Sequence, residues 1–281
     1  MPTFSAYDGT ELAYHEKGEG EPLICLPGGP MRASAYLGDL GGLTAYRRLI
    51  LLDLRGTGDS AVPEDPATYR CDRIVDDVEA LREHLGLDRI DLLAHSASGN
   101  VATLYAARHP KRIRALALIT AASQSVGFTV TVKDHVDAVE VHKGESWYPA
   151  AVAALKEIEA GGSPADAGTA LAPLAYGRWD AVARAHQAAS ATEKNAEAAA
   201  AFYGEGAFDP PATRAALTEL AAPVLVLAGE YDGGPNPALA EEFAGLFPGG
   251  VCQVQPGGGH FPWLDDPEWF VRRVAGFLAQ D

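Results

Sequence analysis

Basic residues are scarce in this sequence, and no long apolar run is present. The 281 residues include 22 Lys and Arg against 38 Asp and Glu, which gives a formal net charge of −16 at pH 7. This charge repels phosphate groups, and the basic residues are scattered along the chain instead of forming a stripe. A nucleic acid is therefore not expected as a partner. A membrane is not expected either, since no apolar run approaches the length of a membrane span.

Cysteine is equally scarce. Cys25, Cys71 and Cys252 are odd in number and lack the short spacing of metal ligands, and each lies in or beside an apolar pattern. They are predicted to be buried free thiols. The eight histidines form no metal-binding pattern either; His135 and His142 could share a helix face, but packing in a lid is favoured over ligation. No metal or organic cofactor is expected.

The first residues lack the pattern of a secretory signal. A signal peptide begins with a basic region that is followed by an apolar core. Residues 1–9, Met-Pro-Thr-Phe-Ser-Ala-Tyr-Asp-Gly, contain neither feature. The sequence therefore predicts a cytoplasmic protein.

Apolar runs and segments with helical spacing alternate along most of the chain. With 47% hydrophobic residues, the chain is long enough for one large domain with a substantial core. Alternation of strands and helices predicts an α/β fold, with a mostly parallel sheet covered by helices on both faces. After an amino-terminal hairpin, the predicted strands are 22–26, 48–52, 90–93, 113–119, 223–228 and 251–254, and the predicted helices are 72–85, 100–108, 237–247 and 267–278.

The alternation stops between residues 124 and 220. This stretch contains alanine-rich helical segments that are broken by glycine and proline, and it has no apolar run typical of a buried strand. It is also too long for a loop. We expect residues 124–220 to form a helical cap, inserted into a core of residues 1–123 and 221–281 that contains the sheet.

Residues 91–100 have the pattern of a strand that enters a sharp turn before a helix. Their sequence, Asp-Leu-Leu-Ala-His-Ser-Ala-Ser-Gly-Asn, places Ser96 at the turn. A serine in such a turn has a strained backbone and needs small residues two positions before and after it. Ala94 and Ser98 meet that need, although the usual G-x-S-x-G motif has glycine at both positions. Ser96 is the predicted nucleophile.

Two further loops contain the groups that a serine nucleophile requires. A hydroxyl is a weak nucleophile at neutral pH and needs a base, whose tautomer is held by a carboxylate. His260 follows the last predicted strand after three glycines, and Asp232 follows the strand at 223–228. Because the carboxyl ends of parallel strands meet at one edge of the sheet, we expect both side chains beside Ser96 as base and orienting acid.

Two backbone amides complete the predicted site. The tetrahedral intermediate of acyl transfer carries an oxyanion that needs preorganised N–H donors. The amide of Ala97 follows the nucleophile at the start of a helix, and glycine lets the Gly28-Gly29 turn approach closely. We assign the oxyanion hole to the amides of Ala97 and Gly29.

Three segments give the chain a resemblance to the α/β-hydrolase superfamily over nearly its whole length. Residues 27–30, Pro-Gly-Gly-Pro, resemble the His-Gly-x-Pro turn, and residues 53–60 resemble the D-x-R-G-x-G-x-S loop. Residues 259–262, Gly-His-Phe-Pro, resemble the segment of the catalytic histidine. The chain order of serine, acid and histidine is also that of the superfamily. The resemblance implies the α/β-hydrolase fold with an inserted cap.

Within the superfamily, the Gly-Gly-Pro turn and the Arg-Gly-Thr-Gly loop are similar to those of proline iminopeptidases. Two features depart from that branch. Pro27 stands where the branch usually has His, and residues 95–98 lack the Gly-x-Ser-Trp-Gly pattern.

The leading functional prediction is a serine hydrolase that cleaves a small ester or amide through an acyl-enzyme intermediate. The alternative is a proline iminopeptidase, which needs carboxylates to bind the amine of a short peptide; Glu193, Glu197 and Glu205 are the candidates, although solvated helix faces remain the favoured interpretation. A third possibility is a non-catalytic binding protein with the same fold. Candidate substrate-binding residues in the cap are Trp147, Trp179, Tyr203 and Glu205.

Overall fold

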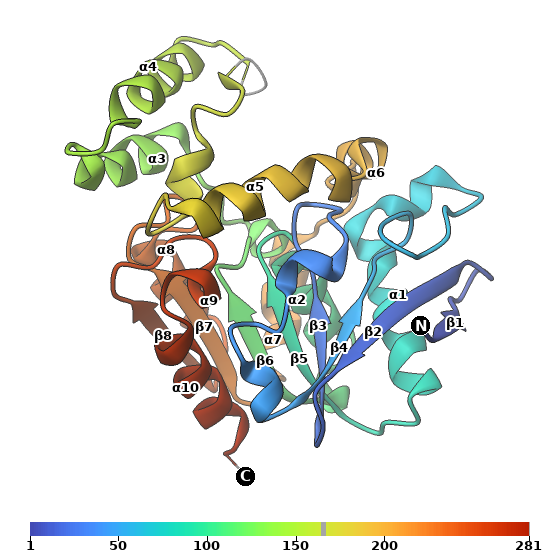
Figure 1. Ribbon diagram of the computed structural model, residues 1–281. Helices are drawn as coiled ribbons and strands as arrows, with labels where there is room; N and C mark the ends of the chain where they lie inside the picture. The colour runs from blue at the N-terminus through green and yellow to red at the C-terminus, as the bar shows by residue number, and fades with distance from the viewer. Residues whose placement is uncertain (164–166, 281) are drawn as a thin grey trace.

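An eight-stranded sheet forms the centre of the computed structural model, which describes residues 1–163 and 167–280 (Figure 1). The strand order is β1-β2-β4-β3-β5-β6-β7-β8. β2 pairs antiparallel with β1 and with β4, and the remaining pairs are parallel. The strands are β1 Thr3–Ser5, β2 Glu11–Lys17, β3 Pro22–Leu26, β4 Arg48–Leu52, β5 Ile90–His95, β6 Ile113–Ile119, β7 Val224–Gly229 and β8 Gly250–Gln255.

Both faces of the sheet are covered, which explains why its parallel strands are continuous apolar runs. Neighbouring side chains in a strand point to opposite faces. In β3, Ile24 packs in the same cluster as the apolar residues of α1, α2 and α8, whereas Cys25 packs with those of α10. These helices are α1 Cys71–His84, α2 Ser98–Arg108, α8 Pro237–Ala244 and α10 Pro267–Leu278. The predicted α/β fold class is confirmed.

A long helical segment connects β6 to its parallel neighbour β7. Its last helix, α7 (Pro210–Leu217), buries Leu217 in the cluster that contains the apolar residues of α2. A crossover of this kind is required between adjacent parallel strands. The division at residues 124–220 stays a prediction, and α7 lies in the helical layer beside the sheet.

Four helices lie above the edge where the parallel strands end (Figure 1). They are α3 Val132–Val139, α4 Tyr148–Glu159, α5 Ala181–Glu193 and α6 Ala196–Phe202. Val139 of α3 and Leu155 of α4 belong to a small separate apolar cluster that also contains Leu174. Ala183 of α5 and Phe202 of α6 instead join the two clusters that cover the sheet. The two helix pairs are therefore attached to the core to different degrees.

The three thiols are free. Cys25 and Cys71 are buried as predicted, and burial raises the pKa of Cys71 to about 12. The burial prediction is wrong in part for Cys252, which is half-buried because β8 is an edge strand with one side unpaired. Within the described ranges, no helix is both long and apolar enough to cross a membrane.

A buried ion pair fixes the loop after β4 to α1. Arg55 Nε and Nη2 donate to the two carboxylate oxygens of Asp77 at 2.8 and 2.5 Å, and Nη1 donates to Asp8 at 2.8 Å. The side chains of Arg55 and Asp77 are 0% and 1% exposed. A bidentate pair at this depth satisfies both charges only while both partners are present.

Replacing Asp77 with Ala is expected to lower the free energy of unfolding by about 3–5 kcal/mol, because it leaves a buried guanidinium without its main partner. Urea unfolding measures the change. Asp88→Ala is the matched control, since Asp88 is the exposed partner of Arg112. The control is expected to leave the stability nearly unchanged. Equal small losses in the two variants would contradict the role of the buried pair.

Candidate active site

Ser96 lies in a sharp turn between β5 and α2. Its φ of 53° is in the left-handed region, which residues other than glycine adopt under strain. The Ser96 N–H donates to the carbonyl of Ile119 at 3.1 Å, and the Ser96 carbonyl accepts from the amides of Gly99 and Ala122 at 2.8 and 2.9 Å. These bonds hold the strained turn in place. The structure thus contains the strand, turn and helix expected from the sequence.

Close packing against the turn after β3 explains the small residues around Ser96. A Cβ added to Gly28 would lie 2.7 Å from the Cβ of Ser96. Ala94 and Ser98, which replace the usual glycines, are both buried. The Ser98 hydroxyl donates to the carbonyl of Pro27. A serine at this position therefore fits, and it ties the turn at Ser96 to the turn that follows β3.

Ser96, His260 and Asp232 form a hydrogen-bonded chain. Ser96 Oγ lies 2.8 Å from His260 Nε2, and His260 Nδ1 lies 2.7 Å from Asp232 Oδ2. Asp232 is 4% exposed, and its Oδ1 accepts from the Gly234 amide at 2.8 Å. The three residues come from the loops after β5, β7 and β8, and the structure brings them together at one edge of the sheet.

The glycine run before His260 is anchored by Asp265. Its two carboxylate oxygens accept from the amides of Gly177 and Gly259 at 3.0 and 2.7 Å. Burial raises the pKa of Asp265. The His260 N–H donates to the carbonyl of Ala175 at 2.9 Å, so a segment of the inserted region holds the backbone of this histidine.

The amides assigned to the oxyanion hole line the same cavity as Ser96. Gly29 has a φ of +127°, and a Cβ there would lie 2.7 Å from the backbone nitrogen of Arg32. The preceding amide, that of Gly28, already donates to Tyr36 Oη at 2.6 Å. The Gly28 amide is thus engaged, and the amides of Gly29 and Ala97 stay the predicted oxyanion donors.

The turn after β3 is also joined to the junction between α5 and α6. The Ala33 N–H donates to the carbonyl of Glu193 at 2.9 Å, and the Asn195 N–H donates to the carbonyl of Met31 at 3.0 Å. Between them, Arg32 Nε donates to Glu193 Oε2 at 2.7 Å. Two short backbone segments thus lie side by side in an antiparallel bridge.

A cavity of about 240 Å³ opens above Ser96. Its apolar wall includes Phe128, Val130 and Pro235, and His135 and Gln124 add polar groups. Among the described residues, no Asp or Glu lines this cavity. The space suits a small, largely uncharged group.

The structure places the four candidate substrate-binding residues differently. Tyr203 lines the cavity and is 40% exposed. Trp147, Trp179 and Glu205 do not line it. Trp147 packs on His142 with ring centroids 4.9 Å apart, Trp179 packs beside the sheet, and Glu205 is exposed. A substrate contact for these three stays a prediction, since they lie away from this cavity; the sequence pattern of a helix does not specify which of its faces meets the core.

The three acidic residues that were candidates for binding an amine lie away from the cavity. Glu193 is paired with Arg32, and Glu197 and Glu205 are exposed. None of the three lines the cavity. The carboxylate that would bind a cationic amine is therefore not supplied by these residues.

The sequence interpretation missed His135 as part of the site and left it as lid packing. In the structure it lies over the loop that carries Asp232, where a Cβ on Gly233 would be 2.7 Å from His135 Nδ1. Burial lowers the pKa of His135, and the Asp232 carboxylate opposes that shift. The helical spacing could place His135 on one face of a helix. It could not predict that this face contacts the loop of Asp232, because the two segments are far apart in the sequence.

A second group missed by sequence spacing is formed by His15, Asp53 and Asp59, whose side chains are close enough to hold a metal ion. Both oxygens of Asp53 already accept hydrogen bonds. Oδ1 accepts from the Ser34 amide at 2.7 Å, and Oδ2 accepts from the Asp59 amide at 2.9 Å and lies 3.0 Å from His15 Nε2. The group therefore has a structural role in closing the loop after β4.

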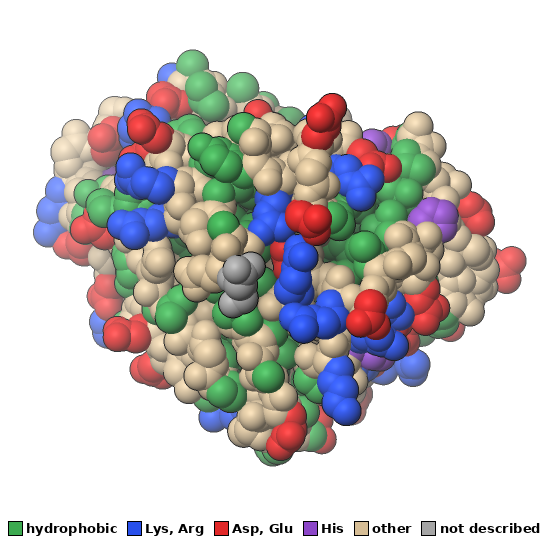
Figure 2. Space-filling view, turned by 90° about the horizontal axis from the view of Figure 1, so that it is seen from below, with side chains coloured by type: hydrophobic (Ala, Val, Ile, Leu, Met, Phe, Trp, Pro, Cys, Tyr) green, Lys and Arg blue, Asp and Glu red, His purple; other side chains and the backbone are tan. Residues whose placement is uncertain are grey.

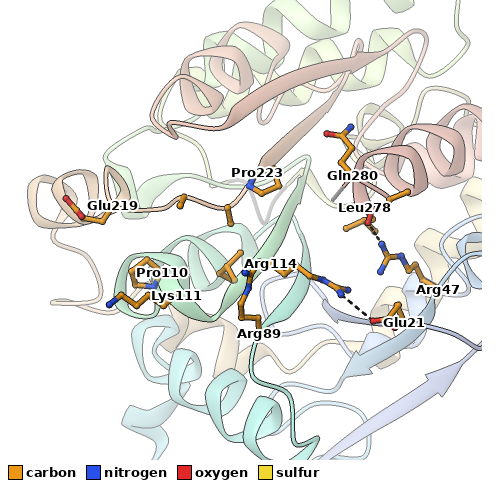
Figure 3. A pocket seen from close by; sticks show the side chains of 14 residues that line it. Glu21, Arg47, Arg89, Pro110, Lys111, Arg114, Glu219, Pro223, Leu278 and Gln280 are labelled. Atoms are coloured by element: carbon orange, nitrogen blue, oxygen red, sulfur yellow. Dashed lines mark hydrogen bonds and ion pairs between the residues drawn. The ribbon is translucent and has the colours of Figure 1, made fainter.

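A larger hollow, of about 900 Å³, lies at the opposite edge of the sheet, where Ile113 begins β6 (Figure 3). Lys and Arg side chains are interspersed with Asp and Glu over this lower face (Figure 2). Arg47 and Arg114 both bind Asp91, at 2.9 and 2.6 Å, and Arg114 also reaches Glu21 at 3.3 Å. These arginines therefore tie strands together and lie apart from Ser96.

Comparison with known proteins places this geometry in a family. The model for the alpha/beta hydrolase fold matches residues 21–267. Proline iminopeptidase of Lactobacillus helveticus is 36% identical over 129 residues, which is 44% of this chain and 44% of that protein. The match thus spans less than half the length of that relative.

Two solved structures match nearly the whole chain. The esterase RhEst1 from Rhodococcus sp. ECU1013 is 26% identical with a TM-score of 0.76, over 99% of this chain and 98% of that one. Proline iminopeptidase of Mycobacterium smegmatis is 25% identical with a TM-score of 0.74, over 99% and 97%. The chain belongs to the α/β-hydrolase fold family, with a likeness to its proline iminopeptidase branch.

Proposed function

We propose that this protein is a serine hydrolase that cleaves a small, uncharged ester or amide through an acyl-enzyme intermediate. The observation that carries the proposal is the pair of linked hydrogen bonds, 2.8 Å from Ser96 Oγ to His260 Nε2 and 2.7 Å from His260 Nδ1 to Asp232. This geometry is what a serine needs to lose its proton while it attacks a carbonyl.

The proposed reaction has two halves. Ser96 Oγ attacks the acyl carbon as His260 Nε2 takes the hydroxyl proton, and Asp232 stabilises the imidazolium through its hydrogen bond to Nδ1. The tetrahedral intermediate collapses when His260 returns that proton to the leaving group. Water then attacks the acyl-enzyme with the same base, which releases the acid and restores Ser96.

The amides of Gly29 and Ala97 are proposed to bind the oxyanion of both tetrahedral intermediates. Donors fixed before the reaction cost no reorganisation when the charge develops, and each contributes about 3–4 kcal/mol to the transition state. The turn that carries Gly29 is held by Tyr36 and by the bridge to residues 193–195. The turn that carries Ala97 is held by the bonds of Ser96.

The lining of the cavity favours an ester or amide without a charged amine. Relatives of this chain include both esterases and proline iminopeptidases. A cationic amine in a cavity this size needs a carboxylate to replace its hydration. The described lining contains none, and Glu193 is already bound by Arg32. We therefore propose esterase-type activity ahead of prolyl aminopeptidase activity.

Ser96→Ala is expected to lower kcat by about 10⁴- to 10⁶-fold, because the nucleophile is lost. It should also abolish labelling by a fluorophosphonate probe. Ser98→Ala is the control: it removes a neighbouring hydroxyl that bonds Pro27 but keeps the nucleophile, so the enzyme should still be labelled and should lose far less activity than Ser96→Ala. Equal loss in both variants would contradict the choice of Ser96. A folded wild-type protein that the probe does not label would instead support a non-catalytic binding protein.

Aryl esters with short acyl groups are expected to be turned over, and proline arylamides are not. The physical reason is the absence of a carboxylate among the described lining residues. Parallel assays of the two substrates with one enzyme preparation measure the ratio of kcat/KM. A ratio that favours the proline arylamide would establish the aminopeptidase alternative and reject our assignment.

Tyr203→Ala is expected to shift the preference toward longer acyl chains, because it removes a large side chain from the cavity wall. The ratio of kcat/KM for an eight-carbon over a two-carbon aryl ester should rise by about 10-fold or more. Tyr46→Ala is the control, since Tyr46 is exposed and lies in a different hollow. The same shift in both variants would argue against Tyr203 as a wall of the acyl site.

A further inference from the structure

A buried chain of hydrogen bonds connects the turn at Gly28 and Gly29, called the oxyanion turn below, to the backbone of His260. The chain runs through two side chains that the proposed mechanism does not use. The Gly28 N–H donates to Tyr36 Oη at 2.6 Å. Tyr36 Oη lies 2.6 Å from His95 Nδ1, and His95 Nε2 lies 2.9 Å from the carbonyl oxygen of His260. Tyr36 and His95 are 6% and 1% exposed.

The chemistry of the partners fixes the direction of each bond. A carbonyl oxygen only accepts hydrogen bonds. His95 Nε2 must therefore carry a proton and donate a hydrogen bond to the backbone carbonyl of His260. Burial first, and then the nearby His260, hold the pKa of His95 well below its usual range. A neutral imidazole with its proton on Nε2 has a bare Nδ1, so the Tyr36 hydroxyl donates to that nitrogen.

Every polar atom of the pair is thereby used. Tyr36 Oη accepts one proton from Gly28 and donates its own to His95. The His260 carbonyl accepts a second bond, from Thr120 Oγ1 at 2.9 Å. A buried network in which each donor meets an acceptor is rigid, and it favours one arrangement of the groups at its ends.

The groups at the two ends are those that must be aligned for acyl transfer. Gly28 precedes Gly29, and His260 carries the proposed base. His95 directly precedes Ser96. One pair of side chains therefore touches the oxyanion turn, the nucleophile turn and the loop of the base.

We propose that Tyr36 and His95 are positioning residues that hold the oxyanion turn and His260 in fixed register across Ser96. This inference rests on the proposed function. It assigns the pair no contact with substrate and no proton transfer, and it predicts an effect on the transition state more than on substrate binding.

The main alternative is that the pair only fills the core, because Tyr36 is surrounded by other rings. Arg32 lies 4.3 Å above the Tyr36 ring, and Phe261 and Trp263 pack on it with centroids 6.2 and 6.3 Å away. Tyr36→Phe keeps all of these ring contacts and removes only the hydroxyl. The variant thus separates positioning from packing.

Tyr36→Phe is expected to lower kcat by about 10- to 100-fold while KM changes by less than about threefold, because small displacements of reacting groups act on the transition state. The rate is measured on a short aryl ester and divided by the number of sites that a fluorophosphonate titrates. This division removes any loss caused by misfolded protein. A kcat per titrated site within about twofold of wild type would overturn the proposal.

Tyr176→Phe is the matched control. Tyr176 is also buried, its hydroxyl lies 2.8 Å from His186 Nδ1, and its ring stacks on Phe261. It belongs to the same group of rings but bonds neither Gly28 nor His95. Its kcat per titrated site should stay near that of wild type; a loss equal to that of Tyr36→Phe would reduce the effect to packing.

A second pair of variants tests His95. Glutamine can accept from Tyr36 and donate to the His260 carbonyl, whereas leucine can do neither. His95→Gln is expected to retain at least about 10-fold more kcat per titrated site than His95→Leu. Equal rates would overturn the proposed role of the hydrogen bonds.

The tautomer of His95 gives a readout that does not depend on turnover. In ¹⁵N spectra of protein labelled in the histidine rings, His95 should show a protonated Nε2 and a bare Nδ1 near neutral pH. A protonated Nδ1 would overturn the proposed network. Failure of wild type to hydrolyse esters or react with the probe would reject the proposed function, and this spectrum would still test the inference.

Discussion

The strained backbone of Ser96 is the constraint on which the site depends. A left-handed conformation is stable there only because the surrounding structure supplies bonds that outweigh its cost, of order 1–3 kcal/mol. The bonds come from the end of β6 and the start of α2. The hydroxyl of Ser96 is held at the edge where the parallel strands end. Its position depends on the register of the sheet, on the placement of α2 and on the small residues of two turns.

Local patterns made much of this arrangement predictable from the sequence. The apolar runs predicted the bounds of β3, β4 and β6 to within a residue. Strands that are buried on both faces are continuous apolar runs, so their ends are clear in the sequence. The loops bearing Asp232 and His260 could be placed beside Ser96 because parallel strands end at one edge. Contacts of the inserted helices were not predictable in the same way. Trp147 and Trp179 carry the aromatic character of a binding site, but contacts between distant segments decide which face each helix presents.

The similar proteins include both esterases and proline iminopeptidases, so the substrate proposal depends on the lining of the cavity. Likeness to proline iminopeptidases extends along the fold, yet fold alone does not determine what a site binds. The described cavity wall combines apolar side chains with hydroxyl, imidazole and amide groups but contains no carboxylate, and Glu193 is paired with Arg32. Residues 124–220 supply Gln124, Phe128, Val130, His135 and Tyr203 to this wall, so the proposal about the substrate depends on that part of the chain.

The antiparallel bridge between residues 31–33 and 193–195 restricts how the cavity above Ser96 can open. Lifting the junction of α5 and α6 would break the backbone bonds that support the turn of Gly29. α3 is attached to a different loop, because Asp134 accepts from Asn236 Nδ2 at 2.9 Å and His135 lies over Gly233. The helices above Ser96 are therefore attached to different groups of the site: the junction of α5 and α6 to the turn of Gly29, and α3 to the loop of Asp232.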